Sequence, residues 1–193
     1  MCSFFCFLTD YILYKSSLVP PLRLVFMMWL LFSLEYYSGM DFGFMGVLPR
    51  SLKGLLGIFT APLIHGNLTH LASNTFPILF LGTTIYYFYN RIASRVFIQC
   101  YFLTNFLVWI FGREFYHIGA SGLVYALASF LISFGIFRRE TRAIFISVVI
   151  VISYGGLIYG ISPANSMISW ESHLLGAIVG VGTAFGMSKI KQI

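Results

Sequence analysis

Residues 171–188 have the sequence ESHLLGAIVGVGTAFGMS. The segment is apolar and is close to the roughly 20 mostly apolar residues that a membrane-spanning helix needs. Small residues recur at every fourth position: Ser172, Gly176, Gly180 and Ala184. Such a stripe lets two helix backbones approach closely in lipid. One histidine, His173, lies near the start, so we expect a packed membrane helix that carries a polar group near one end.

The composition of the whole chain indicates the same class. The 193 residues are 59% hydrophobic and 9% charged, and the mean hydropathy is +0.87. A soluble domain carries roughly 25% charged residues, so this chain has too little polar surface to coat a water-soluble globule. We predict an all-α, polytopic membrane protein with a single domain over residues 1–193 and no soluble appendage.

Six segments are predicted to span the membrane. Their approximate bounds are 20–38, 69–89, 95–111, 119–137, 143–161 and 171–188. The first begins with Pro20 and Pro21, which suit the first turn of a helix, and the residues before it are expected to form a short interfacial helix. The stretch 39–68 is rich in glycine and proline but apolar. We therefore predict a long, membrane-associated first loop.

The basic residues predict the orientation of the bundle. With the N-terminus in the cytoplasm, nine of the 12 basic residues are cytoplasmic: Lys15, Arg23, Arg91, Arg95, Arg138, Arg139, Arg142, Lys189 and Lys191. Three are external: Arg50, Lys53 and Arg113. This bias follows the positive-inside rule, so both termini are predicted to be cytoplasmic. It also explains the net charge of +6 without a nucleic-acid partner.

This orientation brings three polar residues to one depth. The second, fourth and sixth predicted helices run from outside to inside, and His70, Ser121 and His173 each lie near the start of one of them. Polar groups at membrane depth are costly and usually functional. Ser121 is the candidate nucleophile, and His173 is the candidate base because a neutral imidazole can accept the proton of a serine hydroxyl.

Other residues near these positions are candidates for supporting roles. His70 and Asn74 lie four residues apart on one helix face, where both can donate hydrogen bonds to an oxyanion together with the backbone N–H of Ser121. Tyr125 is one turn below Ser121 and can stack against the imidazole of His173. The fourth helix has its own face of small residues: Gly119, Gly122 and Ala126.

No acidic residue completes a triad, so the prediction is a Ser–His dyad. Glu171 lies two residues before His173, about 200° around a helix, and is expected to point away from it. His65 is expected to be structural, and His117, in a short external turn, is assigned no role. The three cysteines lack the spacing of a disulfide framework or a metal site: Cys2, Cys6 and Cys100.

Three motifs together resemble the signature of the rhomboid family of intramembrane serine proteases. HGNLTHLASN at 65–74 resembles the family's H-x4-H-x3-N motif, GASG at 119–122 is similar to its G-x-S-G nucleophile motif, and HLLGAIVG at 173–180 resembles H-x2-G-x3-G. The resemblance covers about residues 20–188. One departure is that the Trp-Arg pair of many rhomboid first loops is not evident, and Pro49-Arg50 is the nearest basic candidate.

The resemblance implies a bacterial-type six-helix bundle, in the bacterial cytoplasmic (inner) membrane, with a water-filled cavity open to the outside. It implies Ser121 as nucleophile, His173 as general base, and an oxyanion hole formed by His70, Asn74 and the Ser121 amide. Gly119, Tyr125, Gly176 and Gly180 are the expected supporting residues. The implied substrates are transmembrane helices cut near their external ends. No cofactor or metal is implied, and the oligomeric state stays open.

Two other functions fit part of the pattern. A catalytically silent rhomboid-like protein would bind transmembrane helices without hydrolysing them. A small transporter or channel would use His70 and His173 as metal or proton ligands. The lack of Asp or Glu partners inside the second to fifth predicted helices argues against the transporter.

Overall fold

The computed structural model describes residues 2–163 and 169–190, with side chains from Ser16 onward. Seven α-helices account for most of these residues: α1 (Cys2–Ser38), α2 (Gly57–Thr60), α3 (Leu68–Phe88), α4 (Asn90–Phe111), α5 (Ser121–Arg138), α6 (Thr141–Tyr154) and α7 (Trp170–Ser188). Four 3₁₀ helices join them: η1 (Gly43–Met45), η2 (Lys53–Leu55), η3 (Ala61–Leu63) and η4 (Gly155–Ile161). The predicted all-α class is confirmed, since these described residues contain no β-strand.

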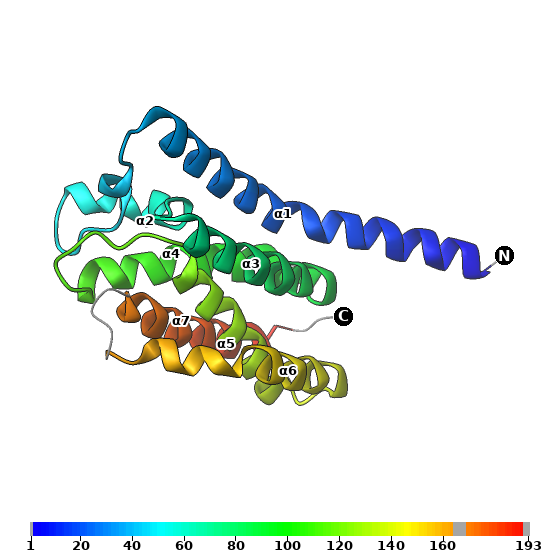
Figure 1. The fold of residues 1–193 in the computed structure, drawn as a ribbon. Helices are drawn as coiled ribbons and strands as arrows, with labels where there is room; N and C mark the ends of the chain where they lie inside the picture. Colours follow the sequence, from blue (N-terminus) through cyan, green and yellow to red (C-terminus); the bar gives the residue numbers. More distant parts are fainter. Residues whose placement is uncertain (1, 164–168, 191–193) are drawn as a thin grey trace.

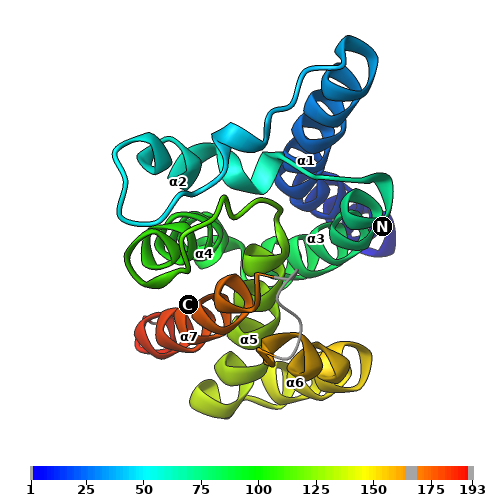
Figure 2. The ribbon, with the colours of Figure 1, turned by 60° about the vertical axis from the view of Figure 1, so that its left-hand side comes forward.

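Within the described part of the chain, four helical segments are long and apolar enough to cross a membrane: Ser16–Ser38, Asn90–Phe111, Ser121–Arg138 and Thr141–Ile161. The first three segments lie in α1, α4 and α5, and the fourth covers α6 and η4. Helices α3 and α7 have comparable lengths of 21 and 19 residues but carry polar residues that lower their hydropathy. These six helices pack together as one bundle, whereas the four-residue α2 lies in the long first loop (Figures 1 and 2).

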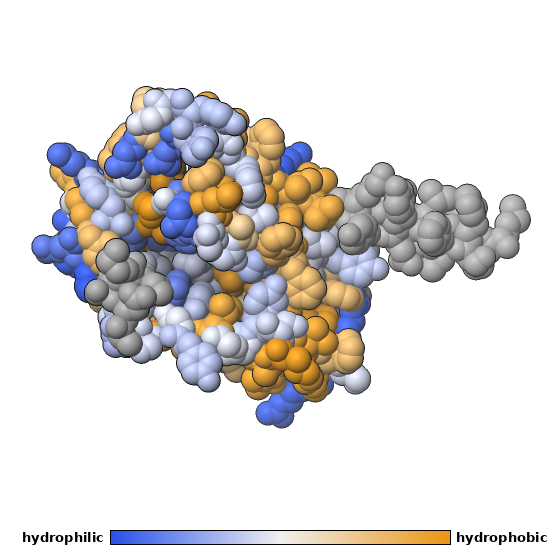
Figure 3. Space-filling view, in the orientation of Figure 1, coloured by the Kyte–Doolittle hydropathy of each residue, from blue (hydrophilic) through white to orange (hydrophobic). Residues whose placement is uncertain are grey.

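Helix α5 is the centre of the bundle. It packs most extensively against α7 and also contacts α3, α4 and α6 (Figure 2). Two thirds of its span (67%) is buried, against 17–28% of the other three apolar spans. Leu127, Phe130 and Leu131 on this helix are fully buried. The outer helices instead expose large apolar side chains, and Figure 3 shows such side chains over much of the flank between the two ends.

Glycines set the distance between α5 and α7. A Cβ on Gly176 would overlap the carbonyl oxygen of Gly122, and a Cβ on Gly180 would overlap the Ala126 carbonyl and the Ser129 hydroxyl. The hydrophobic effect does not drive helices together in lipid, so close packing of small residues has a large part in their association. The small-residue stripe on α7 therefore packs directly against the backbone of α5.

The prediction for the start of the first helix is wrong. It placed Pro20 and Pro21 in the first turn after a separate interfacial helix, whereas α1 runs without a break from Cys2 to Ser38 with both prolines inside it. Proline lacks an N–H, so Pro20 and Pro21 donate no backbone hydrogen bond within the helix. Helices in membranes tolerate this because neighbouring helices, serine or threonine side chains and local adjustments satisfy the freed groups.

The predicted fifth helix, 143–161, also differs in the structure. Regular α-helix ends at Tyr154, and the chain continues as the 3₁₀ helix η4. Gly155 and Gly156 follow Tyr154 directly, and glycine is costly in an α-helix because it loses the most backbone freedom on folding. A 3₁₀ helix has poorer hydrogen-bond geometry than an α-helix. Carbonyl groups of η4 accordingly accept bonds from side chains on other helices.

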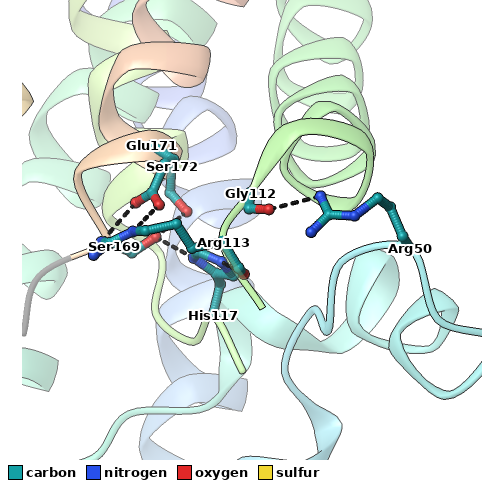
Figure 4. Close-up of polar contacts among 7 residues, drawn as sticks. All are labelled: Arg50, Gly112, Arg113, His117, Ser169, Glu171 and Ser172. Atoms are coloured by element: carbon teal, nitrogen blue, oxygen red, sulfur yellow. Dashed lines mark hydrogen bonds and ion pairs between the residues drawn. The ribbon is translucent and has the colours of Figure 1, made fainter. Parts of the chain in front are cut away.

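The long first loop is fastened to the segment between α4 and α5. Val47 and His117 form an antiparallel β-bridge, with N–H to carbonyl distances of 2.9 Å in both directions. Arg50 adopts a positive φ of 55°, and its guanidinium donates to the Gly112 carbonyl at 2.8 Å (Figure 4). Arg50 therefore anchors this loop through the backbone at the end of α4.

Replacing Gly176 by alanine tests the α5–α7 packing. Gly176→Ala adds a methyl group against the Gly122 carbonyl, and overpacking of this kind is expected to lower the free energy of unfolding by about 2 kcal/mol. Gly182→Ala is the matched control on the same helix, because a Cβ there meets nothing within 4 Å; the gain in helix propensity makes it neutral or stabilising by up to ~1 kcal/mol. Unfolding in mild detergent measures both, and equal stability of the two variants would contradict the packing argument.

Candidate active site

Ser121 and His173 are hydrogen-bonded to each other at the N-terminal ends of α5 and α7. Ser121 is the first residue of α5, and His173 lies in the first turn of α7. His173 Nε2 lies 2.8 Å from Ser121 Oγ, and His173 Nδ1 lies 2.8 Å from the carbonyl oxygen of Gly160. A carbonyl can only accept, so in the neutral imidazole Nδ1 carries the proton and Nε2 accepts from the serine hydroxyl.

Tyr125 packs against one face of the His173 imidazole. Its ring stacks on that of His173 with a centroid distance of 4.2 Å and an interplanar angle of 4°. Its hydroxyl donates to the Leu157 carbonyl at 2.7 Å. Leu157 and Gly160 both belong to η4, so this 3₁₀ helix supplies the acceptors that orient both rings. The sequence analysis placed Tyr125 correctly on α5 but missed η4, because a backbone carbonyl leaves no mark in the sequence.

The turn before Ser121 lies against His70. Gly119 has a φ of +101°, a conformation that other residues rarely adopt, and a Cβ there would overlap the His70 ring. Glycine is therefore required at this position on both counts. The first N–H groups of a helix have no partner within it. The N–H of Ser121, the first residue of α5, therefore has no acceptor inside the helix, and it lies at the positive end of the helix dipole.

His70 and Asn74 lie in the first two turns of α3. The side chain of Asn67 caps this helix by accepting from the backbone N–H of His70 at 2.8 Å. The Asn74 amide donates to the His70 carbonyl at 3.0 Å, which uses one of its two N–H bonds and leaves the other for a further acceptor. Asn74 is buried, with 3% exposure.

A cavity of about 450 Å³ brings the four predicted site residues together. Its lining includes His70, Asn74, Ser121 and His173. Figure 3 shows a hollow with hydrophilic side chains near the end of the molecule where α3, α5 and α7 begin. Over the described residues, no group of three or more His, Cys, Asp or Glu side chains could hold a metal ion. The arrangement offers a nucleophile, a base and hydrogen-bond donors around one polar space.

His65 connects the first loop to the segment that precedes Ser121. It is buried (1% exposed), and its Nε2 accepts from the Ala120 N–H at 3.4 Å. Burial, with a smaller contribution from the nearby His70, lowers the pKa of His65 to about 3. His65 therefore stays neutral at physiological pH, which preserves its acceptor nitrogen.

A polar network beside the dyad was not anticipated. Arg113 forms a bidentate ion pair with Glu171, and His117 Nδ1 lies 2.5 Å from Ser169 Oγ (Figure 4). His117, to which the sequence analysis assigned no role, is buried at 3% exposure. Opposite charges at Arg113 and Glu171, both predicted near the external surface, were the signal that could have identified the pair.

Acidification is expected to destabilise the protein through His65. Its pKa is 6.5 when unfolded and about 3 when folded, so the unfolded state binds more protons between these values and stability falls as the pH drops below 6.5. From pH 7 to pH 5 the expected contribution is about 2 kcal/mol. Unfolding of wild type and His65→Gln in detergent at both pH values checks this: the variant should lose less stability than wild type, and equal losses would contradict the assignment.

Comparisons with known proteins agree with this architecture. Residues 53–190 match the family model of the Rhomboid domain. An uncharacterized protein of Mycobacterium tuberculosis and one of Mycobacterium bovis are each 33% identical over 184 residues, covering 86% of this chain and 73% of the relative. An uncharacterized protein of Mycobacterium leprae is 34% identical over 151 residues, covering 69% of this chain and 57% of the relative. The family match spans most of the chain and both helices that carry the Ser–His pair, and the chain belongs to the rhomboid family of integral membrane proteins.

Proposed function

We propose that this protein is an intramembrane serine endopeptidase that cleaves transmembrane-helix substrates near the external membrane face through a dyad of Ser121 and His173. The 2.8 Å contact between Ser121 Oγ and His173 Nε2 carries this proposal. The Gly160 carbonyl holds the other imidazole nitrogen, so the base is already in the tautomer that accepts the serine proton. A nucleophile activated by an oriented base is the arrangement that acyl transfer requires.

Acylation begins when Ser121 Oγ attacks the carbonyl carbon of the scissile peptide and its proton passes to His173 Nε2. The carbonyl oxygen becomes an oxyanion in the tetrahedral intermediate. The Ser121 N–H and the side chains of His70 and Asn74, on the wall of the same cavity, are the proposed donors to it. The intermediate collapses as the imidazolium gives its proton to the leaving amine, which leaves an acyl ester on Ser121.

Deacylation uses the same groups in the opposite order. Water enters the cavity from the external side, and His173 Nε2 removes a proton as the water oxygen attacks the ester carbonyl. The second tetrahedral intermediate collapses, the proton returns to Ser121 Oγ, and the new carboxyl end leaves. Tyr125 keeps the imidazole in one plane throughout because its own hydroxyl is held by the Leu157 carbonyl.

An apolar surface on the flank of the bundle supports a transmembrane helix as substrate. A groove of about 630 Å³ runs along α3, with side chains such as Phe76, Leu79 and Phe80 along it, and is bordered by Leu18 of α1 and Tyr154 of α6. Phe80 stacks on Tyr154 across the groove at a centroid distance of 5.9 Å. Apolar side chains line most of this groove, which suits a substrate that approaches through lipid.

The proposed setting is the bacterial cytoplasmic (inner) membrane, with both termini in the cytoplasm. The charge bias of the sequence supports this orientation. Arg50 and Arg113 lie at the end of the bundle that carries the dyad. Arg138 contacts the carbonyls of Ser188 and Ile190 at the far end of α7. The cavity then opens to the external side, where water is available for deacylation.

Labelling by a serine-directed fluorophosphonate probe tests the dyad. Wild type should be labelled and should cleave a transmembrane reporter, whereas Ser121→Ala should do neither because the nucleophile is missing. His173→Ala should lose at least 10³-fold in both, since general-base activation is removed. Ser188→Ala is the matched control, because Ser188 Oγ donates to the carbonyl of Phe185 at the opposite end of α7 and does not line the cavity.

Full cleavage by Ser121→Ala would overturn the catalytic assignment. Absence of labelling in folded wild-type protein would instead favour the silent rhomboid-like protein that binds transmembrane helices.

The oxyanion donors are tested by His70→Ala and Asn74→Ala. Each is expected to raise the barrier of the chemical step by about 3 kcal/mol, as loss of one oxyanion-hole donor does, measured as kcat on the reporter. Asn105→Ala is the control for Asn74, because the Asn105 amide makes the same contact to the carbonyl four residues earlier, at 2.8 Å, but does not line the cavity. If Asn74→Ala and Asn105→Ala retain equal kcat, Asn74 is not an oxyanion donor.

A further inference from the structure

A second His–Ser hydrogen bond runs parallel to that of the dyad. His117 lies four residues before Ser121, and Ser169 lies four residues before His173. His117 Nδ1 and Ser169 Oγ are 2.5 Å apart (Figure 4). The same two segments of chain are therefore joined twice, once at the dyad and once beyond the outer ends of α5 and α7.

The direction of the hydrogen bonds in this second contact follows from its ends. His117 Nε2 lies 3.0 Å from the carbonyl of Arg113, so in the neutral ring Nε2 donates and Nδ1 accepts from the Ser169 hydroxyl. Ser169 Oγ in turn accepts from the Ser172 hydroxyl at 2.6 Å. Ser172 belongs to the first turn of α7 and lies next to His173. The chain of bonds thus ends beside the base of the dyad.

An ion pair reinforces the same junction. Arg113 Nε donates to Glu171 Oε1, and Arg113 Nη2 donates to Glu171 Oε2. The Glu171 side chain is 6% exposed. The guanidinium also lies over the rings of Phe115 and Trp170, at 5.0 and 5.8 Å from their centroids. The Arg113 side chain is 40% exposed, so only the carboxylate is buried. Removing Arg113 would leave that buried carboxylate without its partner, which is costly, so the pair resists separation of the two segments.

The glycine contact sets the distance between α5 and α7 but leaves them able to slide past each other along the helix axis. The junction just described can prevent that sliding. Small residues fix how closely two helices approach, but a smooth face offers few side chains that interlock against sliding along the axis. One directional bond crosses this face, from the Ser129 hydroxyl on α5 to the Ala177 carbonyl on α7 at 3.0 Å. The Ser121–His173 contact needs a fixed axial register, because a displacement of about 1 Å can cost ~10²-fold in rate. Directional bonds between the segment before α5 and the first turn of α7 supply that restraint.

We propose that Arg113, His117, Ser169 and Glu171 form an outer clasp that sets the axial register of α7 on α5 and thereby holds His173 Nε2 at Ser121 Oγ. They are positioning residues, since none of them is hydrogen-bonded to Ser121 Oγ or to the imidazole of His173, although His117 and Ser169 also line the cavity. This inference rests on the proposed protease function. It predicts that loosening the clasp weakens the activation of Ser121 more than the binding of a transmembrane substrate.

The rate of fluorophosphonate labelling, with kcat and KM on a transmembrane reporter, tests the clasp. Glu171→Gln and Ser169→Ala should lower both the labelling rate and kcat by about 10- to 100-fold with KM unchanged. Glu114→Gln is the matched control and should behave like wild type. Glu114 directly follows Arg113, and the substitution removes only its exposed ion pair with Arg50, at 3.3 Å. Wild-type labelling rates in both clasp variants would overturn the proposal, as would a change confined to KM.

Two further measurements separate loss of register from loss of folding. The double variant Arg113→Glu with Glu171→Arg should recover part of the labelling rate that each single variant loses; no recovery in a folded double variant would count against the clasp. Hydrogen–deuterium exchange follows the N–H groups of Ser172 and His173, which donate to the Ser169 carbonyl. Faster exchange there in Glu171→Gln supports the clasp, and unchanged exchange overturns it.

The exchange measurement does not depend on catalysis. If wild type is not labelled at all, the proposed protease function fails. The exchange rates of α7 in wild type and Glu171→Gln then still decide whether the clasp exists.

Discussion

The contact of Gly176 with the backbone of Gly122 is the constraint on which the rest of the structure depends. It brings α5 and α7 to backbone distance, so that a serine and a histidine 52 residues apart in the chain reach hydrogen-bonding distance. A side chain at Gly176 would overlap the Gly122 carbonyl, so the two helices would have to move apart and the Ser121–His173 hydrogen bond would lengthen. Because the surrounding lipid is as apolar as the core, this close fit, rather than expulsion of water, has to hold the two helices together.

The polar groups of the site are gathered at one end of the bundle, in first turns and loops. Ser121, His70 and His173 all lie within four residues of the start of a helix. The N–H groups at such a start have no partner within the helix, and here loop carbonyls, capping side chains and buried imidazoles surround them. His65 and Asn67 both make such contacts. Most polar groups around the cavity are therefore partnered, while the N–H of Ser121 and one N–H of Asn74 stay available for an acceptor inside it.

Several features of the fold and the candidate site could be predicted from the sequence, and others could not. The apolar segments indicated a helical membrane protein, and the placement of His70, Asn74, Ser121 and His173 identified the residues that line one cavity. The start of α1 was missed because Pro20 and Pro21 are tolerated inside it. The acceptors on η4 were missed because any residue can present a carbonyl oxygen. The contact between His117 and Ser169 was missed because neither residue belongs to a motif, although they are as far apart in the chain as Ser121 and His173.

The sequence by itself determined the periodicity of apolar and small residues, the end of each helix at which a polar group lies, and the family to which these motifs belong. These properties are local or additive along the chain, so they can be derived without coordinates. Only the tertiary structure decided which imidazole nitrogen faces Ser121, because that choice depends on the Gly160 carbonyl in a separate element. It also decided the pairing of Arg113 with Glu171, because the distance between these two charges depends on how the segment between α4 and α5 packs against the first turn of α7.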